Sequence, residues 1–325
     1  MMETHGLTKH FKDVKAVQGI DLTVHTGELV ALLGPNGAGK STTLRMLTTL
    51  IPPTSGTATV AGFDVVRQQR QVRQRIGYIG QGNGAGHSQR GRDELISQGR
   101  AYGLRVPEAR RRAGELVESL GLAEVADRTV STLSGGQRRR LDIAMGLIHA
   151  PGLLFLDEPS TGLDPQNRAN LQEHILALRD RRETTVVLTT HYLDEADSMA
   201  ERVIVIDHGR IIADDTPSGL KARHVGDRIT LGFDHETEAA RAAATIPHRP
   251  ERHGRTLRIT ADDGPRLLPG ILDDLRAAGL PPASIEVTRP TLDDVFLRLT
   301  GRSLREGGAA PGPAVASATE ELVEA

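Results

Sequence analysis

The residues best able to do chemistry form the octapeptide GPNGAGKS at positions 34–41. It lies between an apolar run and a helix-favouring segment, which is the context that a phosphate-binding loop requires. Its glycines allow successive N–H groups to turn toward phosphates, and the helix expected to begin near Lys40 adds its positive end. We therefore predict a nucleoside triphosphate site. The predicted nucleotide contacts are Gly34, Pro35, Asn36, Gly37, Ala38, Gly39, Lys40, Ser41 and Thr42.

Three side chains of this loop have separate predicted roles. The ammonium of Lys40 can reach between the β- and γ-phosphates, where a planar guanidinium fits differently. The hydroxyl of Ser41 is expected on Mg²⁺, and that of Thr42 near a phosphate oxygen. A glycine-rich turn before an ordinary helix is the competing interpretation, and the strand, loop and helix context argues against it.

Two acidic residues, Asp157 and Glu158, end a second apolar run that starts at position 153. Ligands bind at the carboxyl ends of the strands in a parallel sheet, so this end is expected beside the phosphate loop. We predict that Asp157 is a metal ligand and that Glu158 is the general base that activates water. Taken alone, the pair could equally end a strand in solvent.

A third motif, LSGGQ at positions 133–137, precedes a segment with helical apolar spacing, predicted as a helix over 137–149. Ser134 and Gln137 suit a capping box, which is the simple explanation of the motif. A capping box does not explain two glycines, which instead suit close approach of an anion. A second phosphate-contacting surface is therefore predicted at Ser134, Gly135, Gly136 and Gln137.

The order of GPNGAGKS, LSGGQ and LFLDE resembles that of ABC transporter ATPase subunits, over roughly residues 3–222. The resemblance implies that Phe11 stacks on adenine and that Gln81 senses the metal and the attacking water. It implies that Asp164, within STGLD, belongs to the D-loop, and that His191 is the switch histidine, catalytic together with Lys40 and Glu158. Simple core packing is the alternative for Phe11.

In that family the signature motif acts in trans, on the ATP of a facing subunit. The resemblance therefore implies a second copy of this chain and a separate multi-span membrane permease. The chain would sit on the cytoplasmic face of the cell membrane as a peripheral subunit, touching the membrane only through the permease. The permease is expected near the segment after Gln81, but residues 82–94 are more glycine-rich and basic than is common in drug exporters, which leaves its identity open.

The composition changes after Lys221, where three short strands (228–233, 255–260 and 284–288) and two helices (236–244 and 266–278) are predicted. The ending, residues 289–302, resembles daunorubicin-resistance-type ATPase subunits and favours export of a drug, an antibiotic or a lipid. The predicted fold class is α/β: a P-loop ABC cassette over 1–222 with a helical subdomain at about 88–150, and a small α+β accessory domain over 223–302. Residues 303–325 are predicted to be a disordered tail.

The composition of the chain excludes several classes of protein and of binding site. The 40 basic and 42 acidic residues give no excess charge for nucleic acid, and the absence of cysteine excludes disulfides and thiolate zinc sites. No segment reads as a signal peptide or a membrane span. The arginine clusters at 110–112 and 138–140 are interpreted as solvated helix faces. A GTPase or small-molecule kinase would not need LSGGQ, whereas a soluble, non-transport ABC ATPase stays open; a neighbouring gene for a membrane protein would discriminate against it.

Overall fold

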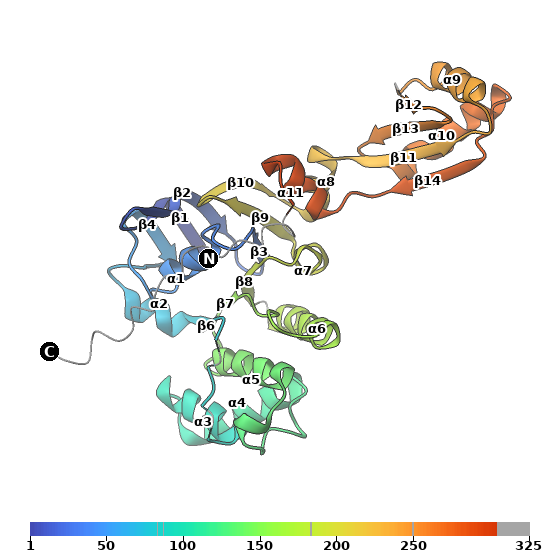
Figure 1. Ribbon diagram of the computed structural model, residues 1–325. Coiled ribbons are helices and arrows are strands. Elements are labelled where there is room, and N and C mark those ends of the chain that lie inside the picture. Colours follow the sequence, from blue (N-terminus) through green and yellow to red (C-terminus); the bar gives the residue numbers. More distant parts are fainter. Residues whose placement is uncertain (83, 87, 183, 249, 304–325) are drawn as a thin grey trace.

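The computed structural model describes residues 1–82, 84–86, 88–182, 184–248 and 250–303 of the 325-residue chain. The predicted disordered tail, 303–325, lies outside these residues except for Ser303. Two sheets and most of the helices form one body, and a third sheet lies at its far end beyond α8 (Figure 1). The predicted α/β fold class is confirmed.

The central sheet has six strands in the order β10-β9-β3-β8-β7-β6. Five are parallel and β10 is antiparallel to β9. Every residue of β3, β7 and β8 is buried, as expected for a parallel sheet covered on both faces, and this is why β3 and the first four residues of β7 form continuous apolar runs. The strands are β3 (Leu29–Leu33), β6 (Ile76–Ile79), β7 (Leu153–Asp157), β8 (Thr185–Thr190), β9 (Arg202–Asp207) and β10 (Arg210–Asp215).

A second, antiparallel sheet in the order β2-β1-β4-β5 covers one face of the central sheet. Val30 and Leu32 of β3 point into the core on this side, together with Leu44 of α1. The elements here are β1 (Met2–Phe11), β2 (Val14–Val24), β4 (Ser55–Val60), β5 (Phe63–Asp64), α1 (Lys40–Leu47) and α2 (Gln69–Arg75).

Helices cover the other face, where Leu29, Ala31 and Leu33 of β3 join a second core. They are α3 (Gly91–Ala101), α4 (Val106–Ser119), the short 3₁₀ turn Val130–Thr132, α5 (Gly135–Leu147), α6 (Pro165–Arg182) and α7 (Leu193–Met199). The helix predicted over 137–149 begins two residues earlier, because Ser134 is its N-cap and the predicted capping box forms with Gln137. The two glycines therefore make the first helical turn.

The C-terminal part has its own four-stranded antiparallel sheet, in the order β12-β13-β11-β14, and its own apolar core. Its elements are α8 (Pro217–His224), β11 (Asp227–Gly232), α9 (Glu236–Thr245), β12 (Glu251–His253), β13 (Thr256–Ala261), α10 (Gly264–Ala277), β14 (Ser284–Thr288) and α11 (Leu292–Thr300). The last helix returns to the first body: Leu292, Val295 and Phe296 pack in the same core as α7.

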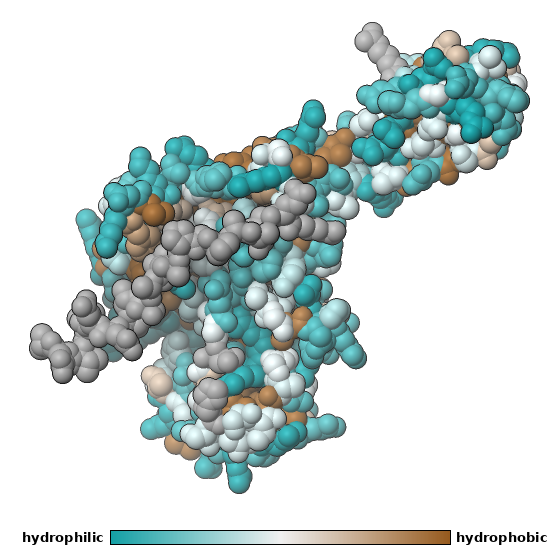
Figure 2. Space-filling model, in the orientation of Figure 1, coloured by the Kyte–Doolittle hydropathy of each residue, from teal (hydrophilic) through white to brown (hydrophobic). Residues whose placement is uncertain are grey.

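The surface is mainly polar on the face that Figure 2 shows, with small hydrophobic areas between polar ones. Large exposed hydrophobic residues in the described part of the chain include Phe11, Val14 and Leu50. Among the described residues, no helix combines the length and the apolar character needed to span a membrane.

Candidate functional site

The phosphate loop joins the end of β3 to the start of α1, and its glycines are required by close packing. Gly39 has φ +105°, and a Cβ there would lie 2.5 Å from the carbonyl oxygen of Ala16. A Cβ on Gly34 would overlap the carbonyl oxygen of Ile206 in β9. Gly37, with φ +81°, also adopts the left-handed conformation that favours glycine. The loop is therefore shaped by β2 and β9 as well as by its own sequence.

A cavity of about 380 Å³ opens at this loop. It is lined by Ala16, Asn36, Gly37, Ala38, Gly39, Lys40, Ser41, Thr42, Gln81 and Glu158. The structure thus brings most of the predicted phosphate-contacting residues to one cavity together with two residues from distant strand ends. A larger cavity of about 550 Å³ lies on the C-terminal part, around Asp262, Asp263 and Arg266. The described residues that line it include no glycine, so it lacks a phosphate-binding loop.

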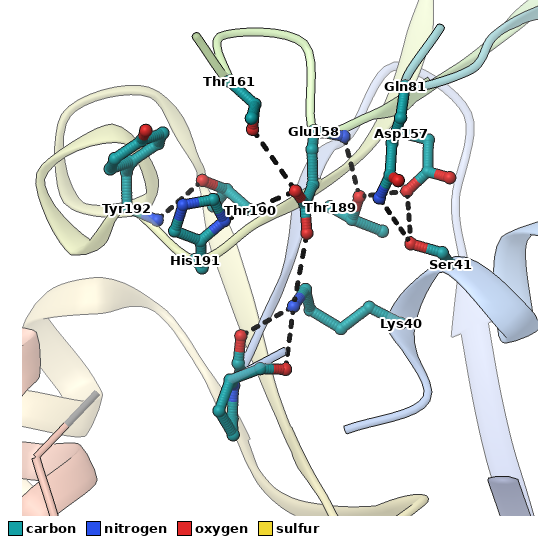
Figure 3. Close-up of polar contacts among 12 residues, drawn as sticks. Lys40, Ser41, Gln81, Asp157, Glu158, Thr161, Thr189, Thr190, His191 and Tyr192 are labelled. Carbon is teal, nitrogen blue, oxygen red and sulfur yellow. Dashed lines mark hydrogen bonds and ion pairs between the residues drawn. The ribbon is translucent and has the colours of Figure 1, made fainter. Parts of the chain in front are cut away.

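Lys40 holds its ammonium inside the loop. Its Nζ donates hydrogen bonds to the carbonyl oxygens of Gly34 at 2.7 Å and Pro35 at 3.0 Å, and lies 3.6 Å from Oε1 of Glu158 (Figure 3). Burial lowers the pKa of Lys40, and Glu158 and Asp157 oppose that change. The side chain is therefore a desolvated cation, placed where an anion would replace carbonyl oxygens as its partner.

The three residues predicted at the metal lie in one hydrogen-bonded group. Ser41 Oγ donates to Asp157 Oδ1 at 2.7 Å, and Gln81 Nε2 donates to Ser41 Oγ at 3.1 Å (Figure 3). Thr189, which sequence reasoning missed, also donates to Asp157 Oδ1 at 2.7 Å. The other carboxylate oxygen, Oδ2, is buried and has no hydrogen-bond partner among the described residues. A hydroxyl, an amide oxygen and a carboxylate with an unpartnered oxygen form a donor set that fits a hard cation such as Mg²⁺.

Glu158 occupies a strained backbone position that aims its carboxylate into the cavity. It has φ +49°, which is uncommon for a residue other than glycine. Its backbone N–H donates to Thr189 Oγ1 at 2.9 Å. The carboxylate accepts a hydrogen bond from Thr161 Oγ1 at 3.2 Å and lies 3.5 Å from Nδ1 of His191. The neighbouring His191 and the charge of Lys40 lower the pKa of Glu158, although burial acts in the opposite direction.

Other predicted residues lie outside the cavity. Phe11 ends β1 with its side chain 46% exposed, and the ammonium of Lys9 lies 5.0 Å from its ring centroid. Asp164 accepts hydrogen bonds from the backbone N–H and side-chain amide of Asn167, at 2.9 and 2.6 Å, at the start of α6. Asn167 in turn packs so closely on Gly136 that a Cβ there would overlap it.

Of the signature residues, Ser134 and Gly135 are exposed, Gly136 is buried and Gln137 is partly buried. None of the four lines the described cavity. The capping box explains Ser134 and Gln137, and the contact with Asn167 explains Gly136. Gly135 meets only Leu163, at 3.8 Å from a Cβ placed there, so packing within the chain does not account for it.

The interpretation of residues 138–140 as a solvated helix face is wrong for Arg139. Its side chain is 8% exposed and donates to three backbone carbonyl oxygens beneath the cavity. Arg112, in the other cluster, donates to the carbonyl oxygens of Leu147 and Ile148. A run of arginines has the same appearance in sequence whether or not one of them turns inward, so no local signal could have shown this.

A buried carboxyl group, Glu195, lies behind the site on α7. The side chain is fully buried, next to the hydroxyls of Thr190 and Ser160, yet neither carboxyl oxygen has hydrogen-bond geometry to a described residue. Burial raises the pKa of Glu195, and Thr190, Ser160, Arg168 and His191 oppose that change. The group therefore favours its neutral form more than an exposed glutamate does.

A phosphate loop, an acidic strand end beside it and a separate SGGQ-capped helix define the class of P-loop ATPases built on an ATP-binding cassette. Comparison with known families agrees. Residues 17–161 match the family model described as ABC transporter, and residues 216–300 match the C-terminal domain of ATP-binding proteins described as DrrA1-3-like.

Individual relatives cover almost the whole chain. The chain is 45% identical to the daunorubicin resistance ATP-binding protein DrrA2 of Streptomyces coeruleorubidus, over 92% of this chain and 95% of that protein. It is 42% identical to the daunorubicin/doxorubicin resistance ATP-binding protein DrrA of Streptomyces peucetius, over 99% and 96%, and 34% identical to the linearmycin resistance ATP-binding protein LnrL of Bacillus subtilis, over 94% and 100%. The chain belongs to the ABC transporter ATP-binding family, and within it to the daunorubicin-resistance type.

Solved structures show the same cassette. That of cbiO1 from Clostridium perfringens matches with a TM-score of 0.63 and 27% identity, covering 67% of this chain and 89% of that one. The dimeric structure of a bacterial ABC transporter cassette matches with a TM-score of 0.61 and 25% identity, covering 66% of this chain and 98% of that one. The chain is thus an ATP-binding ATPase subunit of a transporter family.

Proposed function

We propose that two copies of this chain close around two ATP molecules and drive a separate multi-span permease from the cytoplasmic face of the membrane. One observation carries the dimer: the cavity holds the phosphate loop, Gln81 and Glu158 but none of the residues 134–137. Ser134 and Gly135 stand exposed on another part of the subunit, at the positive end of α5. Supplied by the facing copy, this helix end would complete the binding of the phosphates.

The proposed roles follow the contacts. Lys40 would exchange the carbonyl oxygens of Gly34 and Pro35 for phosphate oxygens, because its buried charge gains more from an anion. Glu158 would then be free to accept a proton from the attacking water, held in place by Thr161 and His191. Phe11, exposed at the end of β1, would stack on the adenine. Asp164, at the start of α6, would lie at the interface between the two copies.

Mg²⁺ would be held by Ser41, Gln81 and Asp157, whose oxygens suit it and whose carboxylate has a buried, unpartnered oxygen. When bound there it would neutralise charge on the phosphate oxygens. The chain itself holds the carboxylate of Asp157 in place through the hydrogen bond from Thr189 on the neighbouring strand.

We propose that the chain divides into a cassette over 1–222 and an accessory domain over 223–302.

Export of a drug, an antibiotic or a lipid is the proposed direction and substrate class. The support is similarity to relatives whose names describe daunorubicin, doxorubicin and linearmycin resistance and Nod factor export. The selectivity surface would lie in the permease. Co-purification with a multi-span membrane protein, followed by a test for substrate-stimulated ATP hydrolysis, examines this part.

The dimer is tested with Glu158→Gln, which keeps the shape of the site but removes the proposed base. We expect light scattering to show monomers without nucleotide and dimers with ATP, because cleavage no longer reopens the interface. Lys40→Ala in the same background is the control and should stay monomeric. Bound ATP with no dimer at any protein concentration would contradict the proposal.

A further inference from the structure

Helix α5 carries two buried charged residues, one helical turn apart, whose side chains face the segments around Gln81 and Glu158. Arg139 is 8% exposed and Asp142 is 4% exposed. Burying a charge is costly unless hydrogen bonds replace its water. Both side chains make such hydrogen bonds to backbone groups of loops that carry proposed site residues.

Arg139 fixes the backbone on both sides of Glu158. Its Nε donates to the carbonyl oxygen of Pro159 at 2.8 Å, and its Nη2 donates to that of Asp157 at 3.3 Å. Its Nη1 donates to the carbonyl oxygen of Gly80 at 2.7 Å. One planar guanidinium therefore holds the strained turn of Glu158 and the residue before Gln81 at the same time.

Asp142 fixes the chain after Gln81. Its Oδ1 accepts hydrogen bonds from the backbone N–H groups of Gly84 and Ala85, both at 3.0 Å. Gln81 is thus held between two attachments to α5, at Gly80 through Arg139 and at Gly84 and Ala85 through Asp142. Its amide reaches Ser41 from this tethered position.

The same helix begins with the signature motif. Its capping box fixes Ser134 to Gln137, so the exposed first turn and the buried residues belong to one rigid element. Arg139 lies four residues after Gly135, about 6 Å along a helix axis. Displacing the first turn by contact with another molecule must therefore move the guanidinium or strain its three hydrogen bonds.

We propose that Arg139 and Asp142 are positioning residues that couple the signature motif of one subunit to Gln81 and Glu158 of the same subunit. The coupling presupposes the proposed dimer, in which the signature motif of one copy rests on the ATP bound to the other. Engagement of α5 at one ATP site would then set the water-orienting and proton-accepting residues at the second site. The two sites would hydrolyse ATP cooperatively.

The test uses Arg139→Gln and Asp142→Ala, compared with two controls. Asp142→Asn keeps an acceptor oxygen toward Gly84 and Ala85. Arg112→Gln, on α4, removes the same kind of guanidinium–carbonyl bonds from the opposite end of α5, at Leu147 and Ile148. All variants are made in the full chain and assayed for ATP affinity, kcat and the Hill coefficient for ATP.

We expect Arg139→Gln and Asp142→Ala to keep ATP affinity within about twofold and to lower kcat about tenfold to a hundredfold, since small misplacement of reacting groups has effects of that size. Their Hill coefficient should fall toward about 1, as expected when the sites no longer couple. Asp142→Asn and Arg112→Gln should retain the parent's kcat and cooperativity. Unchanged kcat and Hill coefficient in Arg139→Gln would overturn the coupling.

Two further readouts separate the possible failures. ATP-dependent dimerisation of Glu158→Gln is measured first. Its absence would refute the dimer, whereas the positioning of Gln81 and Glu158 by Arg139 and Asp142 within one subunit is tested by the second measurement. Hydrogen exchange of the parent chain is measured second: the amides of Gly84 and Ala85 should exchange slowly, and about tenfold or more faster in Asp142→Ala. Fast exchange of both amides in the parent would overturn the proposed positioning role of Asp142 even if the Arg139 variant does not fold.

Discussion

The ammonium nitrogen of Lys40 lies 3.6 Å from the carboxylate of Glu158, and the two side chains are only 3% and 11% exposed. The phosphate-loop lysine and the acidic residue at the end of β7 thus form an ion pair across the cavity. Burial lowers the pKa of Lys40, whereas His191 and Lys40 lower that of Glu158. Each side chain stabilises the charge of the other until a phosphate provides a different partner for the lysine.

Lys40→Ala is expected to lower ATP turnover by at least about a hundredfold, because it removes a preorganised charge from the phosphates. Phosphate release at saturating ATP measures this. Lys40→Arg is the companion variant: a guanidinium keeps the charge but cannot match a compact ammonium between two carbonyl oxygens, so it should restore little activity. Normal hydrolysis by Lys40→Ala would contradict the assigned site.

Thr189→Val is expected to weaken both catalysis and the fold. The hydroxyl donates to Asp157 at 2.7 Å and accepts from the N–H of Glu158 at 2.9 Å, so valine removes two hydrogen bonds from buried groups, which keep Ser41 and the Thr189 carbonyl oxygen as their other partners. Each lost hydrogen bond contributes about 0.5–1.5 kcal/mol to stability, and kcat should fall about tenfold. Urea unfolding and steady-state ATPase assays measure the two effects.

Thr185→Val, at the other end of β8, is the matched control for this prediction. It removes one hydroxyl, which accepts the N–H of Gly27 at 2.9 Å far from the cavity. We expect a loss of stability with kcat unchanged. An equal loss of kcat in both variants would show that Thr189 acts through general stability.

Glu195→Gln is expected to change how stability depends on pH. Burial raises the pKa of Glu195 in the folded chain, so between its unfolded value of 4.5 and its folded value the folded chain holds a proton that the unfolded chain releases. This contribution to stability is full below the unfolded pKa and is lost as pH rises through the folded pKa. Neutral glutamine, facing the same Arg168 and His191, should remove that loss.

Urea unfolding without nucleotide, at about pH 5 and about pH 8, tests this pH effect. The unfolding free energy of Glu195→Gln relative to the parent should be higher at the upper pH. Glu286→Gln, at an exposed glutamate of β14, is the control and should keep the parent's pH dependence. The same difference from the parent at both pH values would contradict the assignment of Glu195 as the titrating group.

Local pattern predicted the buried strands well and the outer strands poorly. The apolar run that starts at position 153 coincides with β7, because a parallel sheet covered on both faces demands continuous apolar residues. The first strand, β1, was not predicted; its half-exposed, polar residues give no continuous apolar run. In the C-terminal part the three longer strands were located to within a residue, and the three-residue β12 was missed.

The sequence by itself determined the phosphate loop, the capping box and the acidic strand end, since each depends on residues within a few positions of one another. Only the tertiary structure decided that Thr189 would hold Asp157, that Asn167 would press on Gly136, and that Arg139 rather than its neighbours would turn inward. These contacts join segments that are 18 or more residues apart. Strand order and helix packing set such contacts, and neither leaves a local trace in spacing or composition.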